Sequence, residues 1–177
     1  MPGTKVCETD RLALRRFTLE DAAFVLELLN EPGWLRFIGD RNVRTLEDAR
    51  AYLERGSIGH YARRGYGFYR VELKATGEPV GMSGLIKRDA LDDVDIGFAQ
   101  LARHAGRGYA QEAAAEVVRH AREDVGLARL VAITTPDNVR SISLLEKLGM
   151  RFERTIRLSD DEAELRLYGM ELGGHEA

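Results

Sequence analysis

The stretch RHAGRGYA, residues 103–110, joins a run with strand-like alternation to a long amphipathic run. Gly106 and Gly108 carry no Cβ atom, so the backbone can turn sharply here and a bulky anion can approach the amides closely. The helix expected to follow directs its N-terminal N–H groups and partial positive charge at the same place, and the two arginines of the stretch add formal charge. The stretch is therefore a candidate cradle for phosphate groups.

Two common phosphate-binding loops do not fit this stretch. A dinucleotide-binding turn has the pattern G-x-G-x-x-G, but the third position here is Gln111. A nucleotide P-loop needs Gly-Lys followed by Ser or Thr, which the stretch lacks. An ordinary strand-to-helix turn stays open as an alternative interpretation of the two glycines alone.

The run behind the stretch has the spacing of a helix. Apolar residues recur every four positions from Tyr109 to Val125, and a second apolar row lies beside them. Two rows form one wide apolar face, so we expect this helix to pack flat on a sheet. Several of these residues are alanines, which let the helix axis come close to the sheet.

Alternation and turn residues predict the remaining elements. The predicted strands are Thr9–Arg16, Tyr66–Leu73, Pro79–Lys87, Val94–Leu101, Leu130–Thr135, Met150–Leu158 and Glu164–Leu172. The other predicted helices are Ala22–Leu29, Leu46–Arg64 and Asn138–Leu148. The sequence Glu31-Pro32-Gly33 is expected to end the first helix. This order of elements predicts a mixed α/β sheet with helices on its faces.

The composition is that of an ordinary globular protein: 177 residues suit one domain, and 44% are hydrophobic and 31% charged. The single cysteine, Cys7, excludes an internal disulfide and a cysteine metal site, and the four histidines are scattered. A net charge of −3 argues against a nucleic-acid partner. No apolar run approaches the roughly 20 residues of a membrane span, and the N-terminus has no signal-peptide core. We therefore expect a cytoplasmic protein with no metal and no membrane partner.

A family resemblance rests on these same residues. The pattern R-x-x-G-x-G at 103–108 resembles the Q/R-x-x-G-x-G/A signature of the GNAT superfamily of acetyl-CoA-dependent N-acetyltransferases. Residues 95–98, DIGF, are similar to the family's E-I-G-Y strand, and residues 106–113, GRGYAQEA, to its G-K-G-Y-A-T-E-A helix start. Residues 138–150 resemble its N-x-x-S…L-E-K-L-G-F segment. Residues 9–15, TDRLALR, are similar to T-E-R-L-x-L-R of the branch that includes the ribosomal-protein serine and alanine N-acetyltransferases.

The resemblance implies a single-domain GNAT fold over residues 1–177, with its core at about 9–172 and a mostly antiparallel central sheet flanked by helices. It also implies acetyl-CoA as cosubstrate and direct transfer in a ternary complex. The strand before the loop is expected to splay from its neighbour and to bond the pantetheine arm, and the loop amides to take the pyrophosphate. The implied cofactor-binding residues are Phe98, Ala99, Gln100, Leu101, Arg103, His104, Ala105, Gly106, Arg107, Gly108, Tyr109, Ala110, Asn138 and Ser141.

Acetyl transfer to an amine needs aligned reactants, a base for the amine proton, a donor to the carbonyl oxygen and a proton for the departing thiolate. The candidate base is Asp95, which is one methylene shorter than the family's usual Glu. The candidate acids are Ser141, by resemblance, and Tyr168; a strand amide near Phe98 or Ala99 is the candidate donor. The three side chains also have structural interpretations: Asp95 as an ion-pair partner, Ser141 as a residue near a helix cap, and Tyr168 as a strand aromatic.

The acceptor is expected to be a primary amine, on a small molecule or a protein N-terminus. Trp34, Phe37 and Tyr66 are candidates for lining its pocket, although aromatic residues at such positions also build cores. Two alternatives stay open. The acyl donor could be another acyl-CoA such as succinyl-CoA, because nothing in the loop reads the acyl group, and the chain could be a non-catalytic CoA-binding or regulatory module. We expect a monomer or a homodimer.

Overall fold

The computed structural model describes residues 2–173, whose backbone forms one eight-stranded sheet in the order β1-β2-β3-β4-β5-β6-β8-β7. The strands are Lys5–Glu8 (β1), Leu12–Arg16 (β2), Phe68–Leu73 (β3), Pro79–Ile86 (β4), Asp95–Gln100 (β5), Arg129–Thr134 (β6), Arg151–Ile156 (β7) and Leu165–Glu171 (β8). Every neighbouring pair is antiparallel except β5 and β6, which are parallel. The prediction of a mixed, mostly antiparallel α/β sheet is confirmed.

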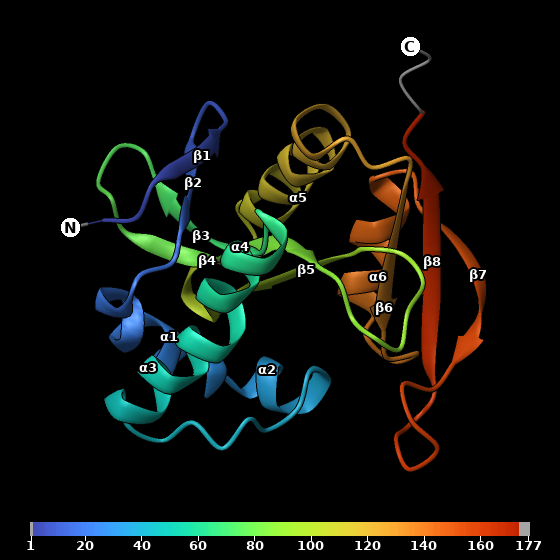
Figure 1. Cartoon of the computed structure of the whole chain (residues 1–177), viewed down its shortest axis with the longest axis horizontal. Coiled ribbons are helices and arrows are strands. Elements are labelled where there is room, and N and C mark those ends of the chain that lie inside the picture. The colour runs from blue at the N-terminus through green and yellow to red at the C-terminus, as the bar shows by residue number, and fades with distance from the viewer. Residues whose placement is uncertain (1, 174–177) are drawn as a thin grey trace.

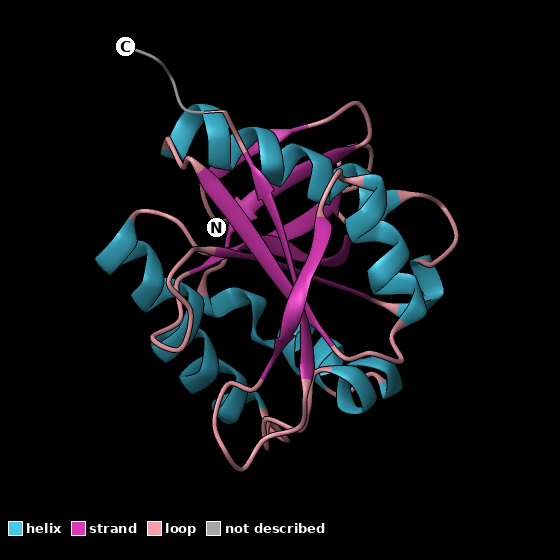
Figure 2. Ribbon diagram, turned by 90° about the vertical axis from the view of Figure 1, so that its right-hand side faces the viewer, coloured by secondary structure: helices cyan, strands magenta, loops and turns pink. Residues whose placement is uncertain are grey.

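Helices cover both faces of this strongly twisted sheet (Figures 1 and 2). They are Ala22–Leu29 (α1), Pro32–Phe37 (α2), Leu46–Leu53 (α3), Gly59–Arg64 (α4), Tyr109–His120 (α5) and Val139–Lys147 (α6). A wide, π-helical turn, Glu54–Ile58, joins α3 to α4, and a second π-helical turn, Ala121–Val125, extends α5. Figure 1 shows β6, β7, β8 and α6 on one side of the molecule and β1 to β4 with α1 to α4 on the other, with β5 between them.

Two apolar clusters lie on opposite faces of β5. The larger cluster contains Ile96 and the buried alanines and valines of α5, such as Ala114 and Val117, as the wide apolar face of this helix predicts. The second contains α1 and α3 residues packed on Leu101, with Ala99 at its edge. Even-numbered residues of β5 therefore face α5, and odd-numbered residues face the α1–α4 side, because successive strand side chains alternate.

The structure differs from the sequence prediction at three places. Strand β1 is an additional edge strand, paired to β2 across a register shift between Lys5 and Cys7. Pro32 does follow the end of α1, but it also begins α2, where its missing N–H group costs nothing. The predicted helix Leu46–Arg64 is broken at Gly56, whose backbone (φ −89°, ψ −106°) is not helical.

Between residues 2 and 173, no helix combines the length and apolar character needed to cross a bilayer.

Candidate functional site

The glycine-rich stretch forms a tight loop at the N-terminus of α5. A short turn, Ala102–His104, follows β5, and Gly106 (φ +81°) and Gly108 (φ +82°) both adopt the left-handed backbone region. This region disfavours residues with a Cβ atom, which explains both glycines. A Cβ atom at Gly106 would meet no atom within 4 Å, so the loop is open on that side. The backbone geometry and the open space fit the pyrophosphate of a CoA molecule at the N-terminal amides of a twelve-residue helix.

Arg11 braces this loop from the β1–β2 side. Its Nη1 donates to the Arg107 carbonyl oxygen at 3.0 Å, and its Nε donates to Glu112 Oε1 on α5 at 2.8 Å. Thr9 also donates its hydroxyl to the Glu112 carboxylate. The Arg11 guanidinium stacks over the Tyr109 ring, 4.6 Å from its centroid. Sequence reasoning missed this role, although Thr9 and Arg11 both lie in the quoted TDRLALR segment.

Strand β5 diverges from β6 along the part that leads to this loop. It pairs with β4 from Asp95 to Gln100, but its register with β6 consists of Asp95 opposite Val131 alone. The splay expected from the family resemblance is therefore present. Beyond Asp95, the edge of β5 that faces β6 offers backbone N–H and C=O groups which the sheet does not use, and such groups demand a partner.

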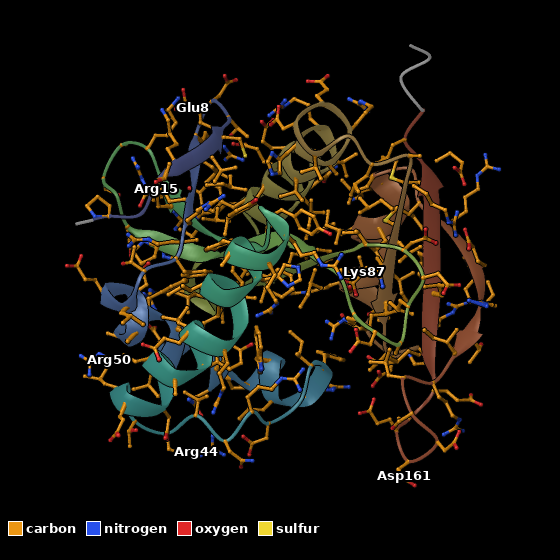
Figure 3. All side chains as sticks on the ribbon, in the orientation of Figure 1. Glu8, Arg15, Arg44, Arg50, Lys87 and Asp161 are labelled. Atoms are coloured by element: carbon orange, nitrogen blue, oxygen red, sulfur yellow. The ribbon has the colours of Figure 1, made fainter. Side chains whose placement is uncertain are left out.

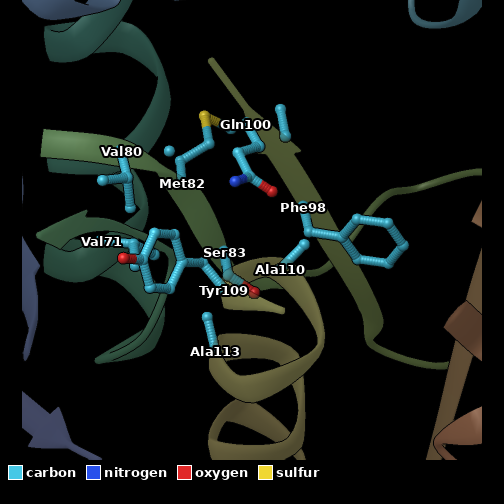
Figure 4. Close-up of a pocket in the computed structure, with 11 residues that line it drawn as sticks. Val71, Val80, Met82, Ser83, Phe98, Gln100, Tyr109, Ala110 and Ala113 are labelled. Atoms are coloured by element: carbon cyan, nitrogen blue, oxygen red, sulfur yellow. The ribbon is translucent and has the colours of Figure 1, made fainter. Parts of the chain in front are cut away.

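A small hollow, with about 220 Å³ of empty space including part of the open solvent, lies under the start of α5. Tyr109, Ala110 and Ala113 of α5 line it together with residues of β3, β4 and β5, among them Phe98 and Gln100. Figure 4 shows Ala110 and Ala113 close to Ser83, whereas the Phe98 ring points away from Tyr109. Five of the predicted cofactor-binding residues, Phe98, Ala99, Gln100, Tyr109 and Ala110, therefore meet around one apolar hollow beside the loop.

Two predicted cofactor residues make protein contacts of their own. The Arg103 guanidinium forms an ion pair with Glu27 on α1, and so it is not directed at the loop. His104 is buried, and its carbonyl oxygen accepts a hydrogen bond of 2.6 Å from the Gln100 side chain. Arg107, by contrast, is exposed, and its side chain makes no hydrogen bond or ion pair within residues 2–173. Arg107 is thus the arginine of the stretch that is available to a phosphate.

Asp95 lies at the point where β5 and β6 separate. Only 2% of the residue is exposed, and Arg88 Nε donates to its Oδ2 at 2.9 Å. Its other oxygen, Oδ1, has no hydrogen-bond partner. Burial raises the pKa of Asp95 to about 6, although the Arg88 charge opposes the shift. The carboxylate is therefore ionised at neutral pH and keeps one free acceptor oxygen. The Arg88 partner was not foreseen, because it follows β4 without any motif.

The two candidate acids lie on the other face of the sheet. Tyr168 on β8 is 1% exposed and belongs to the α5 cluster, and it is paired with Ala132. Ser141 lies in the first turn of α6, where its backbone N–H donates to the Asn138 side chain at 3.2 Å. The amide oxygen of Asn138 therefore caps α6, and Ser141 lies next to this cap as its structural interpretation predicts.

The three aromatic residues suggested for the acceptor pocket do not come together. Trp34 belongs to the cluster of α1 and α3, and Tyr66 to the cluster of α5, where it packs edge-on against His60. Phe37 is half-buried, with the Arg36 guanidinium over its ring. Their role toward a substrate stays a prediction. Within residues 2–173, no group of three or more His, Cys, Asp or Glu side chains is arranged to hold a metal ion.

The family model of the acetyltransferase (GNAT) domain matches residues 11–151. A curated relative, the uncharacterised protein YkkB of Bacillus subtilis (strain 168), is 32% identical over 154 residues, which are 84% of this chain and 87% of that protein. The crystal structure of an acetyltransferase from Agrobacterium tumefaciens str. C58 matches with a TM-score of 0.81 and 24% identity, over 96% of this chain and 95% of that one.

The ribosomal L7/L12 α-N-protein acetyltransferase RimL, solved in complex with coenzyme A, matches with a TM-score of 0.77 and 17% identity, over 95% of this chain and 98% of that chain. The two solved structures are only 24% and 17% identical to this chain, and their similarity concerns the fold alone. With a family model covering most of the sequence and a relative above 30% identity, the chain belongs to the GNAT family of acetyltransferases.

Proposed function

We propose that the protein transfers the acetyl group of acetyl-CoA to a primary amine by direct attack in a ternary complex. The observation that carries the proposal is the open edge of β5, which leads from Asp95 to the Gly106–Gly108 loop at the α5 N-terminus. This arrangement offers backbone groups to a pantetheine arm and helix-end amides to a pyrophosphate in one continuous path. The CoA complex of RimL supports the same ligand.

The chain's own groups divide the binding work. The loop amides of residues 104–109 and the Arg107 side chain hold the pyrophosphate. The β5 edge, residues 98–101, bonds the pantetheine arm, with Asn138 on the opposite side. Bound acetyl-CoA supplies an activated thioester. An amide of β5 near Phe98 or Ala99 donates to the thioester carbonyl oxygen, which gains negative charge as the amine attacks.

Asp95 acts as the general base. An amine that arrives as an ammonium must lose a proton before its nitrogen can attack the thioester. A carboxylate with a pKa of about 6 is ionised at neutral pH and yet accepts a proton more readily than an exposed aspartate. Oδ1 has no hydrogen-bond partner, so it accepts that proton directly or through a water molecule. Arg88 keeps Oδ2 fixed and orients the carboxyl group.

The acid lies across the sheet from the base. Asp95 is opposite Val131, while Tyr168 is opposite Ala132, the next residue of β6. Neighbouring residues of a strand face opposite sides, so the two side chains leave the sheet in opposite directions. Ser141 is on α6, which packs on the Tyr168 face. An amine that enters on the Asp95 face and a thiolate that leaves on the α5–α6 face suit direct transfer through the splay.

Thiol release tests the proposal. The protein is mixed with acetyl-CoA and a panel of amines, and free thiol and acetylated product are measured together. Equal amounts of thiol and acetylated amine, with intersecting initial-velocity lines for the two substrates, are expected. Repeating the assay with succinyl-CoA separates the acyl donors. Saturable CoA binding with no thiol release across the panel would instead identify a non-catalytic CoA-binding module.

A further inference from the structure

A second, larger hollow lies between the α3–α4 segment and the end of β4. It is open to solvent, spans about 1210 Å³ of empty space including part of that solvent, and is lined by thirteen residues, of which five are Arg or Lys and one is acidic. The five cationic residues are Arg55, Arg63, Arg64, Lys87 and Arg88. In Figure 3, Lys87 lies near the middle of the molecule, whereas Arg50 lies at its outer edge. This hollow, the basic groove, brings five cationic residues together in a chain whose net charge is −3.

Two of the five cations of the basic groove have hydrogen-bond or ion-pair partners within the described part of the chain, and three do not. Lys87 Nζ donates to the carbonyl oxygens of Arg88 and Leu91, and Arg88 pairs with Asp95. The other three arginines, Arg55, Arg63 and Arg64, are exposed and make no hydrogen bond or ion pair with any residue in the range 2–173.

Guanidinium groups match carboxylate and phosphate groups in geometry and charge. Three uncompensated guanidinium groups in one hollow raise the local concentration of anions. Asp89 is the sole carboxylate among the lining residues, so the groove itself does not neutralise them.

The basic groove lies on the face of the sheet that carries the proposed base. Ile86 lines the groove and is the cross-strand partner of Asp95. The Phe68 ring also lines it and covers Gly97, the next odd-numbered residue of β5. Arg88 therefore separates the groove from the Asp95 carboxylate, and the groove leads to the place where β5 and β6 part.

The backbone of the α3–α4 segment is irregular beside this groove. The wide turn Glu54–Ile58 contains the non-helical Gly56, and Arg55 and Gly56 both line the groove. Wide helical turns are frequent at functional sites. Here the break separates Arg55 from Arg63 and Arg64 while all three stay on the groove.

We propose that the basic groove holds an oxyanion of the acceptor, so that the acceptor is a small amine that also carries a carboxylate or a phosphate. The oxyanion lies against Arg55, Arg63 and Arg64, and the amine points past Arg88 toward Asp95. This inference rests on the proposed function, and it names the substrate class of the same site.

The first test measures anion binding to the CoA-saturated protein, in which the pyrophosphate loop is already occupied. Inorganic phosphate and malonate are titrated by calorimetry at constant ionic strength into the wild type and into the triple variant Arg55→Gln/Arg63→Gln/Arg64→Gln. Saturable binding of at least one anion, weakened about tenfold or more in the triple variant, is expected. The preferred anion distinguishes phosphate from carboxylate. Arg50→Gln is the matched control, since Arg50 is an exposed α3 arginine outside the groove lining, and it is expected to bind as the wild type.

The second test compares thiol release with four amines of similar size: phosphoethanolamine, β-alanine, propylamine and putrescine. The anionic amines are expected to exceed the other two in kcat/KM by about tenfold, and the triple variant is expected to abolish this preference while leaving the KM for acetyl-CoA unchanged. Equal use of propylamine or putrescine by the wild type overturns the inference. So does unchanged anion binding in a folded triple variant, or no saturable anion binding at all. Anion binding without thiol release from any amine would overturn the proposed function while leaving the anion site itself in place.

Discussion

The guanidinium of Arg11 and the carboxylate of Glu112 link the first strands of the sheet to the first turn of α5. Nε and Nη2 of Arg11 each lie 2.8 Å from Glu112 Oε1, and Nη1 reaches the Arg107 carbonyl oxygen at 3.0 Å. One side chain therefore holds both the helix and the loop in front of it. If the loop amides bind CoA as proposed, this contact positions them without Arg11 touching the cofactor.

Loss of this brace is expected to weaken CoA binding. Arg11→Met removes the fork but keeps an aliphatic stem over Tyr109, so we expect the dissociation constant of CoA to rise about fivefold with a small loss of stability. Calorimetric titration of CoA measures this. Arg157→Met is the matched control, since Arg157 pairs with Glu164 far along the chain from the loop. An equal effect of both variants on CoA affinity would show that the brace has no specific role.

The buried Asp95 predicts a pH dependence of turnover. Its pKa is raised from 3.8 to about 6 by burial, so kcat/KM for the amine is expected to rise as the pH increases through about 6. Asp95→Asn is expected to lower kcat by about 100-fold and to remove this limb of the profile. Asp93→Asn, which changes a half-buried aspartate paired with Arg129, is the control. A full pH limb in Asp95→Asn would exclude Asp95 as the base.

The same group predicts a pH dependence of stability. Because the folded-state pKa lies above the unfolded value of 3.8, the folded protein keeps a proton that the unfolded chain releases between about pH 4 and pH 6. The Asp95 contribution to the free energy of unfolding therefore falls as the pH rises through this window and is constant above it. Urea denaturation of the wild type and Asp95→Asn between about pH 4 and pH 6 measures this contribution as the difference between their free energies of unfolding. The free energy of the wild type is expected to fall relative to that of the variant as the pH rises. A contribution that rises with pH would contradict the burial of the ionised carboxylate.

A second serine on the same helix makes it possible to separate a catalytic role of the Ser141 hydroxyl from an effect on the helix. If the Ser141 hydroxyl protonates the departing thiolate, Ser141→Ala lowers kcat by about tenfold with little change in the KM for acetyl-CoA. Ser143→Ala changes an exposed serine on the same helix and is expected to leave kcat unchanged. The α6 cap survives in both variants, since it uses the backbone N–H of residue 141. Unchanged kcat in Ser141→Ala would leave Tyr168 as the candidate acid.

Cys7 is expected to be chemically silent. The thiol is buried on β1, and burial, followed by the Glu116 charge, raises its pKa to about 12. We therefore expect no reaction with Ellman's reagent in the folded protein, rapid reaction in denaturant, and no acetylated enzyme after incubation with acetyl-CoA. Cys7→Ala is expected to keep its kcat. A mass increase of one acetyl group on Cys7 during turnover would contradict direct transfer.

The local features of this chain could be predicted from its sequence. The loop was found because Gly106 and Gly108 must supply two left-handed residues next to a helix start, and that need is visible in the residue types themselves. The helix behind it followed from its four-residue apolar spacing. The cap of α3, in which Thr45 accepts a hydrogen bond from the Asp48 amide, is local in the same way.

The remaining features depend on how segments meet in the folded chain. The Arg11–Glu112 brace joins residues that are 101 apart in the sequence. Arg88 and Asp95 are only seven residues apart, but their pairing depends on the path of the chain between β4 and β5, for which the sequence has no motif. The basic groove needs a helix broken at Gly56 to face the end of β4. The sequence shows where the arginines are but not which of them lack a partner, because that depends on the folded arrangement.

The most direct test of the account is a titration of CoA into the wild type, Gly106→Glu and Gly126→Glu, with folding checked by circular dichroism. Both glycines have a left-handed backbone (φ +81° and +82°) and open space at the Cβ position, so the two variants carry the same backbone strain. Only Gly106 lies in the loop. The account predicts that Gly106→Glu loses CoA affinity by about 30-fold or more, while Gly126→Glu binds CoA as the wild type does. Wild-type affinity in a folded Gly106→Glu protein would contradict the assignment of this loop as the pyrophosphate site.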